Sequence, residues 1–250
     1  QKQRGAQTDE GRGAHGRTLV QSRARRSVGA LLRRATAVRP MRVRGRGETR
    51  AERDGSAILG AMSTARRLHN TYEEYLRLLE ANQAKLEYCD GEIYAMAGGT
   101  PTHGELASAI NGILRNALVG RCRIHSSDVK IRIEATDLST FPDVSVVCGE
   151  RRTSAIDKNA VVNPSLLVEV TSNSTEDYDR GEKLSHYKQL PSLQAVLIVS
   201  HKRPQVTVVR RIPSGWDVRE LRAGERLVLG SPEMDFGIDE LYSGIELEGE

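Results

Sequence analysis

A single acidic residue inside an otherwise apolar run most constrains how this chain can fold. The run from Leu166 to Thr171 reads Leu-Leu-Val-Glu-Val-Thr and is apolar on both faces except at Glu169. Such a run is typical of a central strand in a sheet that is covered on both sides. An ionised carboxylate at such a place is costly unless it is paired or bound to a metal. The run therefore predicts a central strand and a charged or metallic partner for Glu169.

The patterns on either side of this strand predict an α/β domain with a mixed central sheet flanked by helices. Capping-box signatures at Thr71–Glu74 and Asn173–Glu176 mark two helix starts. Helices are expected over 71–82, 102–119 and 175–190, and 137–141 is expected to be a loop. Strands are expected over 85–89, 92–97, 122–127, 129–134, 142–147, 166–171, 195–199, 205–211 and 216–221.

The dipeptide Asp90-Gly91 predicts a tight turn between the first two strands. If the hairpin closes there, Glu87 lies opposite Tyr94 on the face away from the core. The core face of the hairpin is then formed by Leu86, Tyr88, Ile93 and Ala95.

Residues 1–61 differ in composition from the rest of the chain. They hold 15 Lys and Arg against 5 Asp and Glu, whereas residues 62–250 hold 22 against 28. They contain no aromatic residue and no sustained periodicity, so a disordered, basic, Arg- and Gly-rich extension is expected. It is interpreted as an extension upstream of a domain that starts at Met62, with a phosphate-binding arm and a transit peptide as alternatives. Because the domain itself is mildly acidic, the overall charge is weak evidence for nucleic-acid binding.

The cysteines and the apolar runs limit the cellular setting. Cys89, Cys122 and Cys148 are far apart and include no C-x-x-C, so neither a disulfide framework nor a thiolate zinc site is suggested. A reducing cytoplasm fits this pattern. The apolar runs are about five residues long, far below the ~20 that a membrane helix needs. No membrane partner and no export signal are expected.

A second carboxylate, that of Asp143, is the candidate partner of Glu169. Asp143 stands 26 residues earlier, in Phe-Pro-Asp-Val-Ser-Val-Val, again at the edge of an apolar strand. Two acids on adjacent strands form a site for a hard cation, and the backbone carbonyl of Val170 is a plausible third ligand. Mg²⁺ is the expected metal, with Mn²⁺ as the alternative.

Pro142-Asp143, then Glu169, then a lysine resembles the PD-(D/E)xK nuclease superfamily. The sequence around Glu87, Asp143 and Glu169, together with Asp-Arg-Gly-Glu-Lys at 179–183 and Tyr187, is similar to that of the Uma family of restriction endonucleases. The resemblance covers about residues 70–245. It implies a restriction-endonuclease-like three-layer fold over 62–250 and Mg²⁺-dependent hydrolysis of phosphodiester bonds in DNA.

The resemblance has one departure, because the superfamily lysine stands two residues after the glutamate and here that position is Thr171. The Uma family implies that Lys183, on the following helix, takes the role. Its ammonium would orient the attacking water or stabilise the charge of the transition state. The alternative is that Lys183 is a solvated residue on the helix surface.

The resemblance also implies that Glu87 supports a metal, and the alternative is an ordinary exposed strand acid. His103 and His186 are further candidate site residues. The alternative for His103 is a structural position near a helix start, and for His186 a position on a helix surface. Asp90 and Glu92 are expected to be turn and hairpin residues.

Three functions remain open from the sequence. The first is an Mg²⁺-dependent DNA endonuclease in which Asp143, Glu169, Glu87 and Lys183 are catalytic. The second is a noncatalytic nucleic-acid-binding or interaction module on the same fold. The third is a hydrolase of a nonnucleic phosphate ester. No pattern fixes the oligomeric state, and a homodimer is one option.

Overall fold

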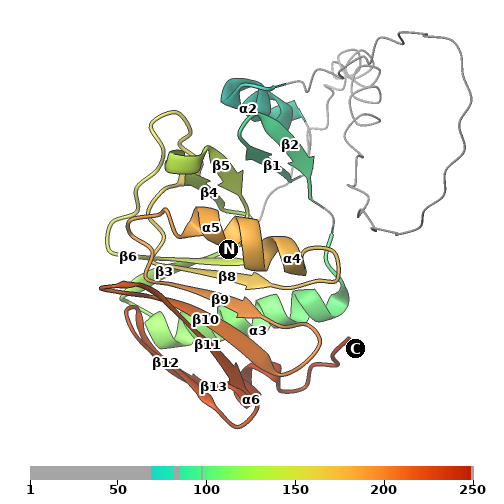
Figure 1. The fold of residues 1–250 in the computed structure, drawn as a ribbon, viewed down its shortest axis with the longest axis vertical. Helices are drawn as coiled ribbons and strands as arrows, with labels where there is room; N and C mark the ends of the chain where they lie inside the picture. Colours follow the sequence, from blue (N-terminus) through green and yellow to red (C-terminus); the bar gives the residue numbers. More distant parts are fainter. Residues whose placement is uncertain (1–68, 82–84, 97, 249–250) are drawn as a thin grey trace, which may run out of the picture. The chain divides into compact units, whose positions relative to one another are not determined.

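The computed structural model describes residues 69–81, 85–96 and 98–248 (Figure 1). All of them belong to one of the two units of the chain, Ser63–Glu250. The extension expected over residues 1–61 lies outside the described residues and stays a prediction.

The described residues are organised around a six-stranded mixed sheet with the order β11-β10-β9-β8-β6-β3. β8 pairs in parallel with β9 and antiparallel with β6. All five residues of β8 are buried, so the predicted central strand is confirmed. The strands are β3 (Cys122–Ser126), β6 (Val144–Cys148), β8 (Leu166–Val170), β9 (Ala195–Val199), β10 (Gln205–Ile212) and β11 (Gly215–Arg222).

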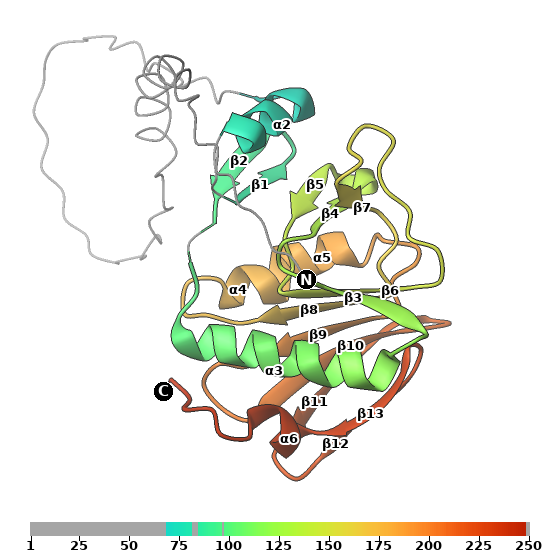
Figure 2. The same ribbon diagram turned by 180° about the vertical axis from the view of Figure 1, so that it is seen from behind.

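Helices cover both faces of this sheet. Helix α3 (Pro101–Leu118) packs on one face through Leu106, Ile110, Leu114 and Leu118, as its periodicity predicts (Figure 2). On the opposite face lies a broken helix made of α4 (Glu176–Tyr178), the π-helical turn η2 (Asp179–Lys183) and α5 (Leu184–Tyr187) (Figure 1). Side chains along β8 alternate between the two faces: Val168 packs on the α3 side and Leu167 on the side of the broken helix. Glu169 therefore points toward the broken helix.

A second sheet with the order β2-β1-β5-β4-β7 carries the predicted hairpin. Asp90 and Gly91 form its turn with φ values of 45° and 81°, which suits the Asp-Gly pair. The register pairs Glu87 with Tyr94, as predicted, but Ala95 is exposed rather than part of the core face. The strands are β1 (Leu86–Cys89), β2 (Glu92–Ala95), β4 (Lys130–Ile133), β5 (Leu138–Thr140) and β7 (Ala160–Val161).

Helix α2 (Tyr72–Ala81) packs its Tyr75 against the hairpin residues Leu86 and Tyr88. Its capping box is formed: the Thr71 N–H donates to Glu74 Oε2 at 2.7 Å, and the Glu74 N–H donates to Thr71 Oγ1 at 3.2 Å. The remaining elements were not predicted. They are the turn η1 (Glu134–Thr136), the strands β12 (Arg226–Gly230) and β13 (Glu233–Gly237), and α6 (Ile238–Tyr242).

Two expectations about local structure are wrong. The segment 137–141 contains the strand β5, which pairs with both β1 and β4. The helix predicted over 175–190 forms over 176–187 with the π-helical turn η2 inside it, but the capping box expected at its start is wrong, because no side-chain cap forms there. Asn173 instead places its Oδ1 3.2 Å from Nε2 of His201.

The expectation that the cysteines form no disulfide is also wrong. Cys122 and Cys148 lie directly opposite each other on β3 and β6 and are disulfide-bonded. Spacing alone hides this pair, because the antiparallel register brings together two residues that are 26 positions apart. The cytoplasmic location, which rested on the cysteine pattern, stays a prediction. Among the residues that the structure describes, no helix combines the length and apolar character needed to cross a membrane.

Candidate active site

The register of the central sheet brings Asp143 to Glu169. Val144 at the start of β6 is paired with Val168, so the preceding Asp143 falls at the level of Glu169, and its charge acts on Glu169. Asp143 Oδ2 accepts the backbone N–H of Val170 at 2.8 Å. The two predicted acids and the Val170 backbone therefore meet at one end of the β6–β8 pair.

Lys183 reaches this place from the broken helix. Its Nζ lies 3.0 Å from Oε1 of Glu169, 3.4 Å from Oε1 of Glu87 and 3.6 Å from Oδ1 of Asp179. Only 5% of its side chain is exposed, so it is not a solvated helix residue. The turn η2 supplies both Asp179 and Lys183, and both are buried.

Glu87 approaches the same ammonium from β1. It lies on the hairpin face away from α2, as predicted, but it is buried, so the alternative of an exposed strand acid is wrong. The Thr140 hydroxyl on β5 donates a hydrogen bond to Glu87 Oε1. Glu87 is therefore held between Thr140 and Lys183.

The charges at this site do not balance. Three carboxylates, those of Glu87, Glu169 and Asp179, contact one ammonium. Burial raises the pKa of Glu169 to about 8, and Lys183 only partly offsets this effect. Burial likewise raises the pKa of Asp179. An added cation would relieve this excess of negative charge, so the donor set fits a divalent metal.

The side chain of Lys183 keeps its positive charge. Burial would lower the pKa of its ammonium, but Glu169, Tyr187, Glu87 and Asp179 together hold that pKa well above its ordinary value. The Tyr187 hydroxyl on α5 also donates to Glu169 Oε1. Lys183 is thus a fixed positive charge and hydrogen-bond donor, and not a general base.

His103 belongs to the same cluster. It stands in the first turn of α3, where the Thr100 hydroxyl caps the helix by accepting the His103 N–H at 3.2 Å. Its Nε2 lies 3.3 Å from Asp143 Oδ2, and its ring also hydrogen-bonds to the Val170 carbonyl. The bond to Asp143 raises the pKa of His103, against the opposing effect of burial. His103 therefore contacts two of the groups that were predicted to bind a metal.

Thr171, at the usual place of the superfamily lysine, does not belong to the cluster. Its side chain is fully buried, and its Oγ1 lies 2.8 Å from Nδ1 of His201 and bonds to the Val199 carbonyl. A lysine at this position would displace these contacts.

Two polar residues of the site, Asp179 and Thr140, were not among the predicted site residues. The i, i+4 spacing places Asp179 beside Lys183, but no sequence pattern assigned it a role in the site. Thr140 gave no signal, because it lies on a three-residue strand that resembled a loop.

The chain matches the model of the Uma2 family, described as "Putative restriction endonuclease", over residues 72–239. It is 39% identical over 175 residues to the protein slr1290 of Synechocystis sp., covering 69% of this chain and 91% of that protein. A second Synechocystis protein, sll1609, is 32% identical over 130 residues, covering 52% of this chain and 73% of the relative.

The fold is also found in a crystal structure from Anabaena variabilis, described as "a putative nuclease belonging to DUF820". That match has a TM-score of 0.58 and 17% sequence identity, and it covers 70% of this chain and 98% of the other. The α/β architecture with a central mixed sheet is therefore the fold of that structure.

Proposed function

Since the chain belongs to the Uma2 family, we propose that it is a metal-dependent endonuclease that hydrolyses phosphodiester bonds in DNA. The observation that carries this proposal is the excess of buried carboxylates around Lys183. A structural ion pair would need one acid for one base. The surplus is the arrangement that a divalent cation and a phosphate would complete.

In this proposal the metal is Mg²⁺, with Mn²⁺ as the alternative. Asp143, Glu169 and the Val170 carbonyl are its ligands, and Glu87 supports the first metal through water or holds a second. When bound, the metal would polarise a phosphoryl oxygen and lower the pKa of a coordinated water.

The protein's own groups have separate roles. Lys183 orients the attacking water and stabilises the negative charge that grows on the phosphate. Because the pKa of its ammonium is raised, Lys183 does both without exchanging a proton. Tyr187 and Thr140 fix the carboxylate oxygens of Glu169 and Glu87 that face Lys183. His103 and the Val170 N–H fix Asp143.

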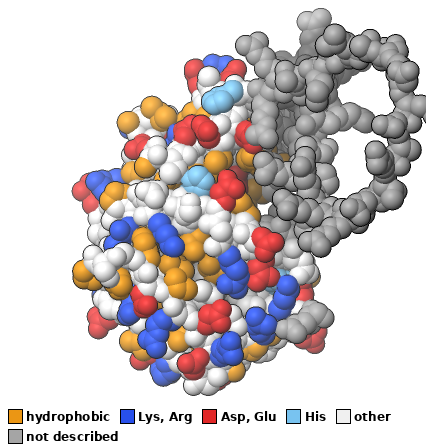
Figure 3. Space-filling model, in the orientation of Figure 1, with side chains coloured by type: hydrophobic (Ala, Val, Ile, Leu, Met, Phe, Trp, Pro, Cys, Tyr) orange, Lys and Arg blue, Asp and Glu red, His pale blue; other side chains and the backbone are white. Residues whose placement is uncertain are grey.

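The nucleic-acid partner follows from the family and not from a basic surface. On the face drawn in Figure 3, Lys and Arg side chains are interspersed with Asp and Glu side chains. Residues 62–250 hold 22 Lys and Arg against 28 Asp and Glu, so contacts to DNA would be local. A cytoplasmic location and a homodimer are compatible with this proposal.

Cleavage of supercoiled plasmid by the purified protein tests the proposal. Nicked or linear product is expected with Mg²⁺ or Mn²⁺ and none with EDTA, while Glu169→Gln should give none with either metal. A protein that binds DNA without needing a metal and leaves it intact would instead be the noncatalytic module. Turnover of a simple phosphate ester with intact plasmid would favour the nonnucleic hydrolase.

A further inference from the structure

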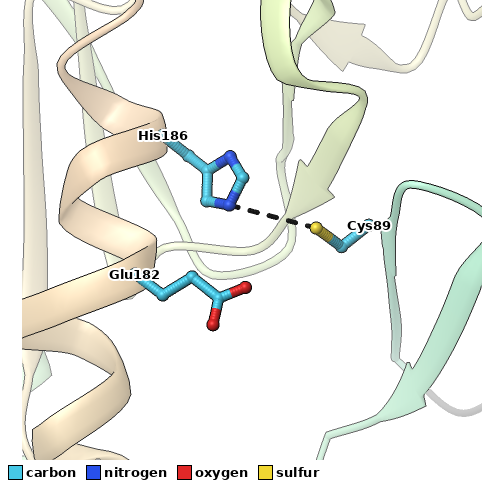
Figure 4. Close-up of side chains that lie close together, drawn as sticks. All are labelled: Cys89, Glu182 and His186. Carbon is cyan, nitrogen blue, oxygen red and sulfur yellow. Dashed lines mark hydrogen bonds between the residues drawn. The ribbon is translucent and has the colours of Figure 1, made fainter.

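Beside the candidate active site lies a cluster of three different ligand types. The Sγ of Cys89, a carboxylate oxygen of Glu182 and a ring nitrogen of His186 all lie within 4.8 Å of one another. Figure 4 shows Glu182 and His186 projecting from the broken helix toward Cys89 on the neighbouring strand. Cysteine spacing gives no sign of this cluster, because a single cysteine contributes to it.

The backbone explains why these side chains meet. Glu87 and Cys89 are two residues apart on β1 and share a face. Glu87 contacts Lys183, and Cys89 contacts His186, which is three residues further along the broken helix. Glu182 is four residues before His186 and therefore lies on the same side of the helical turn. The cluster is a second contact between β1 and the broken helix, two of the elements that contribute side chains to the active site.

We propose that Cys89, Glu182 and His186 bind a Zn²⁺ ion that clamps β1 onto the broken helix. Sγ of Cys89 and Nε2 of His186 are 4.0 Å apart. Ordinary Zn–S and Zn–N bonds at a tetrahedral angle place these two atoms roughly 3.6 Å apart. The pair is thus within a few tenths of an ångström of the spacing that zinc needs. Glu182 is exposed, so its side chain can close the remaining distance.

The ligand chemistry selects zinc over the metal of the active site. A sulfur, an imidazole nitrogen and a carboxylate oxygen form a borderline-soft set, whereas Mg²⁺ prefers oxygen ligands alone. Burial, followed by the negative charges of Glu182, Asp90, Asp137 and Glu87, raises the pKa of the Cys89 thiol to about 11, so zinc binding would displace the thiol proton. With three protein ligands, the fourth position is left for water.

The clamp would act on the geometry of the active site. Zinc would fix Cys89 to the broken helix, and Glu87 two residues earlier would be fixed relative to Lys183. The proposal goes beyond the nuclease function, because the site and its test need no catalytic activity.

Titration of the metal-free full-length protein with Co²⁺, used as a spectroscopic substitute for zinc, tests the site. We expect a thiolate-to-cobalt charge-transfer band, strong visible bands of a tetrahedral complex, and loss of both on adding Zn²⁺. Cys122 and Cys148 are disulfide-bonded, so in the oxidised protein the charge-transfer band can come only from Cys89. Cys89→Ser should abolish it.

The other two ligands and the controls make the test specific. Glu182→Gln and His186→Ala should each weaken Co²⁺ and Zn²⁺ binding at least tenfold. Asp177→Asn on the same broken helix, His125→Gln on β3 and Glu169→Gln in the active site should leave the band unchanged. Zn²⁺ should also raise the Tm of the wild type but not of Glu182→Gln, whose exposed side chain is not needed for folding.

Absence of the charge-transfer band in the wild type would overturn the proposal. So would a band of unchanged affinity in both Glu182→Gln and His186→Ala, since Cys89 would then bind cobalt without this cluster. Either result would leave the Cys89–His186 contact as simple packing. Neither would bear on the nuclease proposal, which is tested by plasmid cleavage.

Discussion

Lys183 connects the stability of the site with its chemistry. Its ammonium contacts three carboxylates that would otherwise be buried together without compensation. Each of these acids carries a desolvation cost, and one positive charge offsets only part of the total. Changes at this site should therefore affect activity and stability in different directions, depending on which charge is removed.

Removing one of the acids should separate stability from activity. Asp143→Asn and Glu169→Gln should each abolish Mg²⁺-dependent cleavage, because a ligand carboxylate is lost. The metal-free fold should keep or gain stability, because both changes reduce repulsion between carboxylates. Calorimetry of the metal-free proteins beside the plasmid assay measures both effects. Severe destabilisation by both changes would favour a purely structural ion-pair network.

Removing the lysine should have the opposite effect on stability. Lys183→Ala leaves Glu87, Glu169 and Asp179 buried without a counter-charge, and breaking a buried pair typically costs about 3–5 kcal/mol. Turnover should fall by a few orders of magnitude, while Mg²⁺ affinity stays within severalfold or rises. Lys183→Arg should rescue poorly, because a planar guanidinium does not replace a compact ammonium.

The matched control for this change is Lys158→Ala, which removes an exposed lysine and should alter neither turnover nor stability. Melting with and without Mg²⁺ and single-turnover cleavage are the measurements. Near wild-type turnover in Lys183→Ala would remove this residue from the mechanism.

The pH dependence of metal binding follows from Glu169. Its pKa of about 8 in the metal-free fold lies above the ordinary value of 4.5, so below pH 8 a metal must displace its proton. Mg²⁺ affinity should therefore rise with pH up to about 8, by at most tenfold per unit for one proton. Calorimetric titrations at pH 6, 7 and 8, in buffers of different ionisation enthalpy, measure both affinity and proton release.

The raised pKa of Glu169 also predicts how the stability of the metal-free protein depends on pH. Because the folded pKa is raised, the stabilisation from protonated Glu169 is complete below about pH 4.5 and is lost as pH rises through 8. Glu169→Gln should have a flatter stability profile over this range. A pH-independent Mg²⁺ affinity would show that Glu169 is already ionised.

At the scale of elements, the strongest periodic patterns were predictable, whereas the π-helical turn inside the broken helix was not. The strand β8 and the helix α3 follow from apolar runs and a 3.6-residue stripe, which are local signals. The turn η2 buries Asp179 and Lys183, and Lys183 there contacts Glu87 and Glu169, which are distant in sequence. Such tertiary charge contacts leave no local signature, so the sequence pattern predicts an ordinary helix.

The residues of the candidate site also divide into those that could be predicted from the sequence pattern and those that could not. Asp143 and Glu169 could be found because each is an acid at the edge of or inside an apolar strand. Lys183 and Glu87 came from the family resemblance, and their burial could not be read from their own neighbours. The contact of His103 with Asp143 depends on the position of α3 over the sheet.

The cross-strand disulfide offers a prediction at the level of one pair of strands. It closes a loop of 26 residues between β3 and β6, for which chain entropy gives ~3.5 kcal/mol of stabilisation. A reducing agent, or the double change Cys122→Ala and Cys148→Ala, should lower the Tm accordingly. Cys89→Ser in metal-free protein is the control. Free thiols at all three positions in non-reducing mass spectrometry would contradict the pairing.

At the scale of the whole molecule, charge divides the chain more sharply than any other property. The basic residues 1–61 precede a domain with more acids than bases, and the family match begins only at residue 72. The 175 residues aligned with slr1290 cover 91% of that protein but 69% of this chain. The family match therefore lies wholly outside the basic extension.

We accordingly predict that residues 1–61 are dispensable for folding and for metal-dependent cleavage. A protein that starts at Met62 keeps every core contact described for residues 69–81, 85–96 and 98–248, so its Tm and its turnover at saturating DNA should match those of the full chain. Melting and plasmid cleavage of the two proteins, side by side, are the measurements. A large loss of stability in the shorter protein would show that the extension is part of the fold. A loss confined to DNA affinity, and strongest at low salt, would instead assign the 15 Lys and Arg of the extension to phosphate contacts, because such contacts release counterions and weaken as salt is added.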